Sequence, residues 1–361
     1  IANLVFDALR HKLSLGARMG DAGPRALVLA TYAVSWAQGV EALETVLEGD
    51  RFAPTPLSPE ERAALSADHV FAAGDQERAD VPDWLWPEFE RAFGADVVAE
   101  GAALSARAPI DLRVNRLKSD RDKLLKKLAH TNARPTAISP VGLRIAPPAG
   151  KERAPHVQAE EGFQKGWFEL QDEASQIAAL VASSVSPSQV LDFCAGGGGK
   201  TLALAGEMDN RGQIYAHDAS KLRLAPIYDR LRRAGARNVQ VRDPEAGGLQ
   251  DLTARMDLVF VDAPCSGSGV WRRRPDSKWR ITANALAARQ AEQQQVLEAA
   301  RGYVRPGGHL LYATCSILPS ENEEQVRTFL AAETGFEPVD LAALWPTLFG
   351  EAGPLPRFTA E

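Results

Sequence analysis

Three cysteines follow apolar runs in the C-terminal half of this sequence, each where a strand could end. Cys194 closes VLDFC, Cys265 closes LVFVDAPC and Cys315 closes HLLYATC. A thiolate with a depressed pKa is a strong nucleophile, whereas a free cysteine buried in an apolar core is usually inert. Either interpretation suits one cysteine alone. A second strand-end thiol, with Asp262 three residues before one of them, favours nucleophilic chemistry.

A glycine-rich stretch, GGGGKT, comes directly after the first of these strands. Gly196 to Gly199 let the backbone approach a ligand closely, and a helix beginning there leaves amide groups free for an electron-rich partner. Asp218 ends the next predicted strand about twenty residues later, where an acid can bind a ribose hydroxyl. The arrangement predicts a nucleoside cofactor, and it suits NAD as well as S-adenosylmethionine.

The same stretch has a second interpretation as the phosphate-binding loop of an ATPase, GxxxxGK[ST]. Gly199, Lys200 and Thr201 fit the end of that motif, and LVFVD resembles a Walker-B strand. Its first glycine would fall on Cys194, so the match fails there. An ATPase also has no use for two strand-end thiols.

Alternating strands and helices from about Gly162 onward must position these residues. Short β-rich runs are separated by helical stretches, and these runs are VLDFC, IYAHD, VQVRD, LVFVDAP and HLLYATC. Such alternation predicts an α/β fold with a doubly wound, mostly parallel sheet, in which ligands lie beyond the carboxyl ends of strands. The acidic stretch Glu321 to Glu324 is predicted to be the first turn of the next helix, where negative charge suits the helix dipole.

The composition is that of a globular protein, with 45% hydrophobic and 24% charged residues among 361. No apolar run approaches the ~18 residues of a membrane span, and no secretory signal is recognisable. Three cysteines without metal-ligand spacing argue against a disulfide framework and a structural metal, and they predict a reducing, cytoplasmic location. The helical pattern that opens at Ile1 and the ending PLPRFTAE predict that both ends of a longer protein are missing.

The N-terminal part of the chain differs sharply in charge from the segment after it. Residues 1–105 have helical patterns and a net charge of −9, whereas residues 106–145 carry +7 in a chain whose total is −6. The basic segment contains a strand candidate, IDLRVN, and a basic helix, SDRDKLLKKLAH. It is either a solvated helix face or a phosphate-binding strip.

Four stretches taken together are more specific than any one of them: WFELQDEASQIAALV, LDFCAGGGGKT, DAPCSGSG with its downstream RRRPD, and YATCSILPSENE. In this order they resemble the motifs of the RNA cytosine-5 methyltransferases of the NOL/NOP/Sun type. That family's loop commonly reads Ala-Ala-Pro-Gly-Gly-Lys, whereas Gly196 and Gly197 replace the second alanine and the proline here. The loop is therefore looser, but Lys200 and the final glycines remain.

The resemblance implies that residues 161–361 form a Rossmann-like class I S-adenosylmethionine-dependent methyltransferase domain. Its reaction would methylate C5 of a cytosine in RNA. Because C5 is a poor nucleophile, a thiolate first adds at C6 and makes the ring an enamine. By resemblance Cys315 is that thiolate, Cys265 helps remove the C5 proton or release the product, and Asp262 binds the cytosine edge. Lys200 would lie close to the base and its developing charge.

The resemblance also implies the residues that bind S-adenosylmethionine. Asp218 would bind the ribose, Asp243 would lie near the adenine, and Arg223 falls on the family's arginine after the second strand. The complete predicted set is Cys194, Ala195, Gly196, Gly197, Gly198, Gly199, Lys200, Asp218, Arg223, Asp243 and Asp262.

In the family a small α/β RNA-binding subdomain precedes the catalytic domain, here residues 106–160. The helical residues 1–105 resemble the NusB-like domain of bacterial members that methylate small-subunit ribosomal RNA. The target cytosine must leave its stack, so we expect single-stranded or locally opened RNA, ribosomal RNA rather than tRNA, and a monomer that binds no membrane and no metal. A non-catalytic RNA-binding assembly factor is the alternative. The predicted RNA contacts are Arg113, Arg116, Lys123, Lys126, Lys127, Arg272, Arg273 and Arg274.

Overall fold

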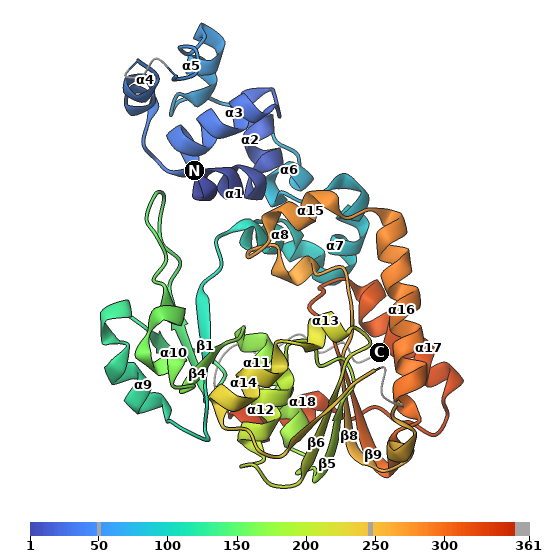
Figure 1. The fold of residues 1–361 in the computed structure, drawn as a ribbon. Helices are drawn as coiled ribbons and strands as arrows, with labels where there is room; N and C mark the ends of the chain where they lie inside the picture. The colour runs from blue at the N-terminus through green and yellow to red at the C-terminus, as the bar shows by residue number, and fades with distance from the viewer. Residues whose placement is uncertain (49–51, 245–247, 351–361) are drawn as a thin grey trace.

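The computed structural model of this chain describes residues 1–361 except for residues 49–51, 245–247 and 351–361. A helical head is followed by a small antiparallel sheet and then by a larger parallel sheet with helices on its faces (Figure 1). The head forms the top of the figure, the small sheet lies at the lower left and the larger sheet at the lower right. Among the described residues no helix is long and apolar enough to cross a membrane.

The larger sheet is parallel throughout and has the strand order β7-β6-β5-β8-β9. The chain starts in the middle at β5, winds outward to β7 and then returns to β8 on the other side of β5. In such a sheet the reversal leaves a crevice at the carboxyl ends of the two central strands. The predicted α/β fold class is confirmed, and all five predicted strands form. They are β5 (Gln189–Asp192), β6 (Gln213–His217), β7 (Val239–Arg242), β8 (Met256–Asp262) and β9 (Val304–Ala313).

The central strands are apolar on both sides because helices cover both faces of the sheet. Val190, Leu258 and Phe260 pack with α11 (Glu173–Ser183) and α12 (Gly199–Glu207). Their neighbours along the strands, such as Leu191 and Val259, point the other way and share a core with α16 (Ala283–Arg301). The further helices are α10 (Glu161–Gln164), α13 (Lys221–Leu224), α14 (Ile227–Ala234), α15 (Pro275–Arg280), α17 (Glu323–Ala332) and α18 (Leu341–Phe349).

The acidic stretch after Cys315 differs from its prediction. Only Glu323 and Glu324 lie in the first turn of α17. Glu321 belongs to a separate 3-10 turn, Pro319–Glu321, and is completely buried. The sequence could not distinguish these acids, because burial of Glu321 depends on hydrogen-bond donors from other parts of the chain.

The small sheet is antiparallel, with the order β2-β3-β1-β4. Its apolar side packs against α9 (Arg121–Lys127), which begins where the side chain of Asp120 accepts a hydrogen bond from the amide of Lys123 at 2.8 Å. Strand β4 pairs with β1 and ends at Leu170. The sheet therefore continues beyond residue 160, the predicted end of the basic subdomain. Its strands are β1 (Ile110–Val114), β2 (Arg134–Pro135), β3 (Gly142–Ile145) and β4 (Phe168–Leu170).

The head is helical, as predicted, but its helices belong to two cores. Residues of α1 to α5 share one core. Residues of α6 to α8 share another with Trp271, Leu286 and Leu318 of the larger region, where Phe89 stacks on Trp271 at 5.4 Å between ring centroids. The helices are α1 (Ala2–Arg10), α2 (Lys12–Met19), α3 (Pro24–Ala30), α4 (Val40–Glu48), α5 (Pro59–Leu65), α6 (Asp75–Ala79), α7 (Trp86–Phe93) and α8 (Val97–Ser105), with a π-helical segment, Thr31–Ser35, after α3.

Helix α15 joins the head to the larger region through a buried lysine. The ammonium group of Lys278 donates to the carbonyl oxygen of Arg10 at 3.0 Å and lies 2.9 Å from the hydroxyl of Ser105. The indole of Trp279 donates to the carbonyl oxygen of Leu9 at 2.7 Å. These contacts fix α1 and α8 against the segment that follows Cys265.

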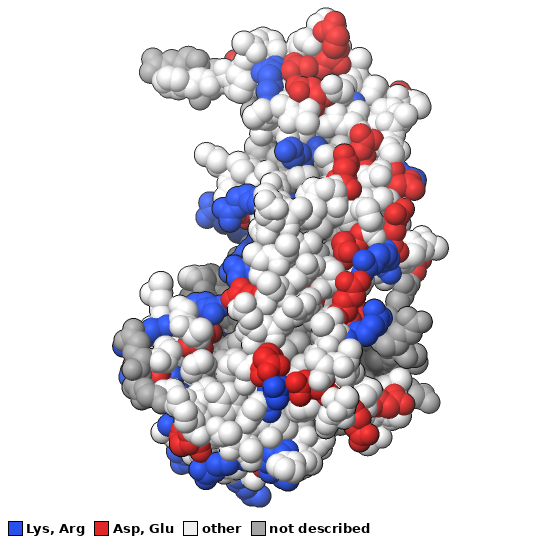
Figure 2. Space-filling view, turned by 90° about the vertical axis from the view of Figure 1, so that its right-hand side faces the viewer, with Lys and Arg blue, Asp and Glu red and all other residues white. Residues whose placement is uncertain are grey.

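Charge is divided unevenly over the surface. Figure 2 shows Asp and Glu gathered at the upper end and along one margin of the face in view, and Lys and Arg mainly along the other margin and at the lower end. The upper end is the head, whose sequence is strongly acidic. Figure 1 places the small sheet of the basic segment below and to the left of the head, and Arg107 at the start of that segment forms an ion pair with Asp7 of the head.

Candidate active site

A cavity of about 480 Å³ lies at the carboxyl ends of β5, β6 and β8. Strand ends from distant parts of the sequence meet there because the strands are parallel and adjacent. The predicted site residues that line the cavity are Cys194, Ala195, Gly196, Gly197, Gly199, Lys200, Asp218, Arg223, Asp262, Cys265 and Cys315.

Cys265 and Cys315 lie side by side at this cavity, with 3.2 Å between their sulfur atoms. The pairing of β8 with β9 explains the contact, because it places Asp262 opposite Ala313 and both cysteines follow within three residues. The hydrogen bond from Cys265 lowers the pKa of Cys315, although burial opposes this. The same hydrogen bond, together with burial, raises the pKa of Cys265. The pair is therefore suited to hold a Cys315 thiolate beside a Cys265 thiol.

Lys200 and Asp262 form an ion pair at the floor of the site, with 2.5 Å between the ammonium nitrogen and a carboxylate oxygen. Lys200 lies in the first turn of α12, and Asp262 ends β8. Lys200 favours the thiolate of Cys315 and Asp262 opposes it, and both effects on its pKa are smaller than that of Cys265. The cation is thus held close to the nucleophile by a neighbouring anion.

Asp218 is buried at the rim of the cavity, where three donors hold its carboxylate. The amide of Gly196 donates to one oxygen at 3.0 Å, and the amide of Ser220 donates to the other at 2.8 Å. The guanidinium of Arg223 lies 2.9 Å from that second oxygen. Arg223 therefore reaches the cavity through its ion pair with Asp218, and the glycine loop is fixed by the same carboxylate.

Two members of the predicted cofactor set are absent from the described lining of this cavity. Gly198 sits behind the loop, with a φ of +81°, and a Cβ there would come within 2.5 Å of Ile227. Asp243 follows β7, and its carboxylate lies 3.2 Å from the ammonium group of Lys221. The adenine contact of Asp243 stays a prediction.

One buried acid that our sequence prediction omitted lines the cavity as well. Asp192 ends β5, and one of its oxygens accepts a hydrogen bond from the Thr201 hydroxyl at 2.6 Å, while the other has no partner among the described residues. Burial raises its pKa to about 7, and the hydrogen bond from Thr201 works in the opposite direction. The signal was present in LDFC, an acid ending a central strand directly before the glycine loop.

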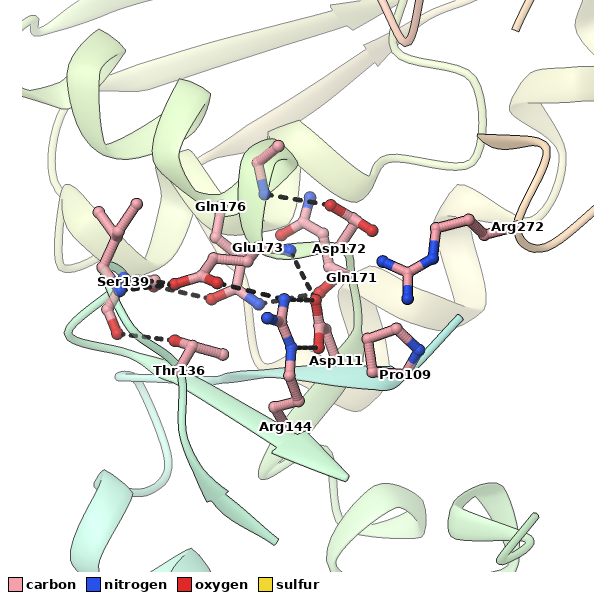
Figure 3. A network of polar contacts seen from close by, with 12 residues as sticks. Pro109, Asp111, Thr136, Ser139, Arg144, Gln171, Asp172, Glu173, Gln176 and Arg272 are labelled. Carbon is pink, nitrogen blue, oxygen red and sulfur yellow. Dashed lines mark hydrogen bonds and ion pairs between the residues drawn. The ribbon is translucent and has the colours of Figure 1, made fainter. Parts of the chain in front are cut away.

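Further residues at the edge of the cavity come from the start of α11, which the small sheet holds in place. Gln171 and Asp172 line the cavity. As Figure 3 shows, Arg144 donates twice to Asp111, at 2.7 Å each, and Asp111 also accepts from the amide of Glu173 at 3.1 Å. The small sheet thus positions one wall of the site. The other lining residues that the prediction omitted are Leu170, Ser175, Ala263, Pro264 and Arg230.

Arg113 does not fit the predicted role of a phosphate contact. It is only 5% exposed, and its guanidinium donates to Gln171 and, at 2.8 Å, to the carbonyl oxygen of Gly199. Burial lowers its pKa to about 10, an effect that Glu169 partly offsets. The prediction was wrong for this residue, because β1 turns its side chain inward, where it supports the glycine loop.

The remaining predicted RNA contacts differ in exposure. Lys123, Lys126, Lys127 and Arg274 are exposed, and so is Arg116, which pairs with Glu207. Arg272 is half-buried and donates to the carbonyl oxygen of Arg107 at 2.9 Å. Arg273 is exposed, but it donates to the carbonyl oxygen of Pro109 at 2.9 Å and pairs with Asp172. Contact of these side chains with RNA stays a prediction.

No group of three or more His, Cys, Asp or Glu side chains in the described part of the chain could hold a metal ion. The groups that the cavity does bring together are the two thiols, the Lys200–Asp262 pair and the glycine loop.

Two family models match this chain. The model described as 16S rRNA methyltransferase RsmB/F matches residues 180–346, and the RsmF/B-like ferredoxin-like domain matches residues 81–150. Together they match about two thirds of the chain. The chain belongs to the RsmB/F methyltransferase family.

The RsmB/F family match agrees with the arrangement of the head. The ferredoxin-like model begins at residue 81, after α6, and so includes α7 and α8, two of the three helices whose core is shared with Trp271, as well as β1 to β3. The division into domains at residues 105 and 160 stays a prediction.

Relatives and solved structures also resemble this RsmB/F member. Ribosomal RNA small subunit methyltransferase B of Sodalis glossinidius is 37% identical over 264 residues, which are 71% of this chain and 59% of that protein. A methyltransferase homolog protein from Pyrococcus horikoshii is 26% identical, with a TM-score of 0.59 over 71% of this chain and 81% of its own. NSun6 from the same organism, solved with SFG, shares the fold at 24% identity, with a TM-score of 0.61 over 70% of this chain and 88% of its own. The chain spans less than three fifths of the curated relatives it matches.

Proposed function

We propose that this chain transfers the methyl group of S-adenosylmethionine to C5 of a cytosine in RNA, and that small-subunit ribosomal RNA is the substrate. The observation that carries the proposal is the pair of thiols, Cys265 and Cys315, in contact at the rim of a glycine-lined cavity. Relatives named ribosomal RNA small subunit methyltransferase B support the choice of RNA. A ribosomal substrate and three free cysteines suit the predicted cytoplasmic location.

The residues around the cavity fit S-adenosylmethionine. The volume of the cavity, about 480 Å³, lies within the range of small-molecule sites, roughly 300–1,000 Å³. Gly196 has a φ of +49°, a conformation that favours glycine. Because glycine has no side chain, a ligand can approach the backbone of the loop closely. Asp218 offers a carboxylate to ribose hydroxyls, and Asp192 offers to an amine the oxygen that has no partner among the described residues. When bound, the cofactor supplies an electrophilic methyl group on a sulfonium.

Cys315 carries the first step of the proposed reaction. Its thiolate forms a bond to C6 of the cytosine, and the electron pair of the C5–C6 double bond becomes available at C5. C5 then bonds to the methyl carbon as the bond from that carbon to sulfur breaks. Loss of the C5 proton allows the bond between Cys315 and C6 to break, which restores the aromatic ring and frees the enzyme.

Cys265 and the Lys200–Asp262 pair assist this sequence. Cys265 holds its proton beside Cys315 and so stabilises the thiolate. Once it has given that proton up to solvent, its own thiolate accepts the C5 proton or takes part in releasing the product. Asp262 binds the amino edge of the cytosine, and the ammonium of Lys200 stabilises the charge that develops on the ring. Because the base must reach both thiol and cofactor, it leaves its stack.

The test is methyl transfer from S-adenosylmethionine labelled in the methyl group to total RNA, followed by mapping of the labelled nucleotide. We expect 5-methylcytosine in small-subunit ribosomal RNA, and we expect Cys315→Ser to reduce the rate about a thousandfold or more. Label in tRNA and not in ribosomal RNA would overturn the proposal that small-subunit ribosomal RNA is the substrate. Absence of label, or a Cys315→Ser variant as active as the wild type, would overturn the reaction proposed.

A further inference from the structure

A buried glutamate, Glu321, lies between the two segments that carry the thiols and has no part in the chemistry above. Its residue is 0% exposed, although it follows Cys315 by only six positions in a loop at the edge of the sheet. Burying a carboxylate is costly unless its oxygens are satisfied by hydrogen bonds. The position of those bonds therefore indicates what the residue does.

Among the described residues, two of the three hydrogen bonds to the Glu321 carboxylate come from Ser266, next to Cys265, and the third comes from Gln293 of α16. One oxygen accepts from the amide of Ser266 at 2.7 Å and from the side-chain amide of Gln293 at 3.0 Å. The other accepts from the hydroxyl of Ser266. The side-chain amide of Gln293 also donates to the carbonyl oxygen of Pro264 at 2.9 Å. Residues on both sides of Cys265 are thereby tied to one carboxylate.

The next residue, Asn322, binds the other thiol segment in the same way. Its side-chain oxygen accepts from the hydroxyl of Thr314 at 2.6 Å, directly before Cys315. Its side-chain nitrogen donates to the carbonyl oxygens of Ser316 at 3.1 Å and Leu318 at 3.0 Å. Adjacent residues thus hold opposite sides of the thiol pair.

We propose that Glu321 and Asn322 together form a clamp that sets the distance between the two sulfur atoms. Glu321 fixes the loop of Cys265, Asn322 fixes the loop of Cys315, and the peptide bond between them joins both. They are positioning residues, since each acts on a thiol through neighbouring residues. The role in methyl transfer rests on the function proposed above, whereas the control of the thiol contact does not.

The clamp has an electrostatic consequence as well as a geometric one. The charged and titratable groups that face the thiols are Lys200 from α12, Asp262 from β8, Tyr312 from β9 and Glu321 itself. The negative charge of Glu321 adds to the contact with Cys315 and to burial in raising the pKa of Cys265. The clamp therefore keeps the proton on Cys265, which leaves Cys315 as the thiolate.

The decisive experiment measures the thiols directly in the whole chain. Diamide takes up the two thiol hydrogens as a disulfide forms, so the rate of Cys265–Cys315 disulfide formation reports their separation. We expect Glu321→Gln and Asn322→Ala to slow this reaction at least tenfold. The pH midpoint for alkylation of Cys315 by iodoacetamide should move upward in both. In methyl transfer kcat should fall about 100-fold, with KM for RNA within about twofold.

Controls separate the clamp from general damage and from the proposed function. Glu323→Gln, two residues away at the start of α17, should behave as the wild type, and Glu321→Asp should recover part of the disulfide rate. If Glu321→Gln does not unfold cooperatively on heating, Ser266→Ala, which removes one donor to the carboxylate, should show a smaller shift of the same sign. Wild-type thiol reactivity in both Asn322→Ala and Ser266→Ala would overturn the clamp. The thiol measurements decide this even if the chain methylates no RNA.

Discussion

At the scale of single residues, the structure gives the three strand-end cysteines different chemistry. Burial raises the pKa of Cys194 to about 12, and nearby Asp192 adds to this, so this thiol is the inert kind. Cys315 is exposed at the cavity and receives a hydrogen bond from Cys265, which lowers its pKa. The expectation that a free cysteine is inert therefore suits Cys194, whereas the exposed Cys315 has the lowered pKa of a nucleophile.

Asp192 provides a prediction about stability and pH. Burial raises the pKa of its carboxyl from 3.8 to about 7, so between these values the folded state binds more protons than the unfolded state. Stability must then fall as pH rises through that window. Asp192→Asn cannot ionise, so we expect its stability relative to wild type to improve by about 2 kcal/mol between pH 5 and pH 8.

Thermal unfolding at the two pH values measures this difference. Asp229→Asn, at a side chain that is 84% exposed, is the matched control. Its free energy of unfolding should differ from that of the wild type by the same amount at both pH values. A constant difference for Asp192→Asn would mean that Asp192 is ionised in the folded protein throughout this range.

At the scale of elements, the glycine loop depends on how closely α12 packs against α14. Gly198 precedes α12 in a left-handed conformation, and Ile227 of α14 fills the space that a Cβ would need. Lys200 lies two residues further on, so the packing of two helices fixes the cation of the site. The loop is thus closely packed against α14 even though it lacks the proline that the family commonly has there.

Gly198→Ala should destabilise the protein by about 2–4 kcal/mol, because it combines a positive φ with a contact of 2.5 Å to Ile227. Gly206→Ala, in the same helix with no atom within 4 Å of the added Cβ, should be neutral or stabilising by about 0.5–1 kcal/mol. Urea unfolding of both variants measures the contrast. Equal stability of the two would show that the loop can shift away from α14.

At the scale of the whole molecule, the acidic head lies above the larger sheet that carries the cavity, and the basic small subdomain lies beside that sheet (Figure 1). Of the predicted RNA contacts, the lysines of α9 are exposed, whereas Arg113 is internal. Lys123 also lies 4.6 Å from the ring centre of Trp167, which places a flat aromatic surface beside the basic one. Such a combination suits an RNA strand, because bases stack on aromatic rings and phosphates pair with lysines.

Replacing Lys123, Lys126 and Lys127 by alanine should weaken binding of single-stranded ribosomal RNA fragments and flatten its dependence on salt. Loss of three phosphate contacts corresponds to a slope of log K against log salt that is smaller by about 2. Binding measured between 50 and 200 mM salt tests this. Arg62→Ala, on α5 of the head, is the control and should leave the slope unchanged. An unchanged slope in the triple variant would assign α9 to the solvated-face alternative.

The sequence by itself determined the elements and the motifs at their ends. Apolar runs separated by helical stretches predicted β5 to β9. That the strands run parallel to one another follows from the same alternation. Residues at strand ends, such as Asp218, Asp262 and the cysteines, therefore had to meet at one edge of the sheet. These features are local, because they depend on periodicity and on residues adjacent in the chain.

Only the tertiary structure decided burial and partnership. The register of β8 against β9 brings the two sulfurs to 3.2 Å, and no spacing along the chain specifies that register. Arg113 and Glu321 look like surface charges in the sequence, but both are buried by donors and acceptors more than 25 residues away. The physical reason is that burial and hydrogen bonding depend on which distant segments pack together, and this is a property of the folded chain as a whole.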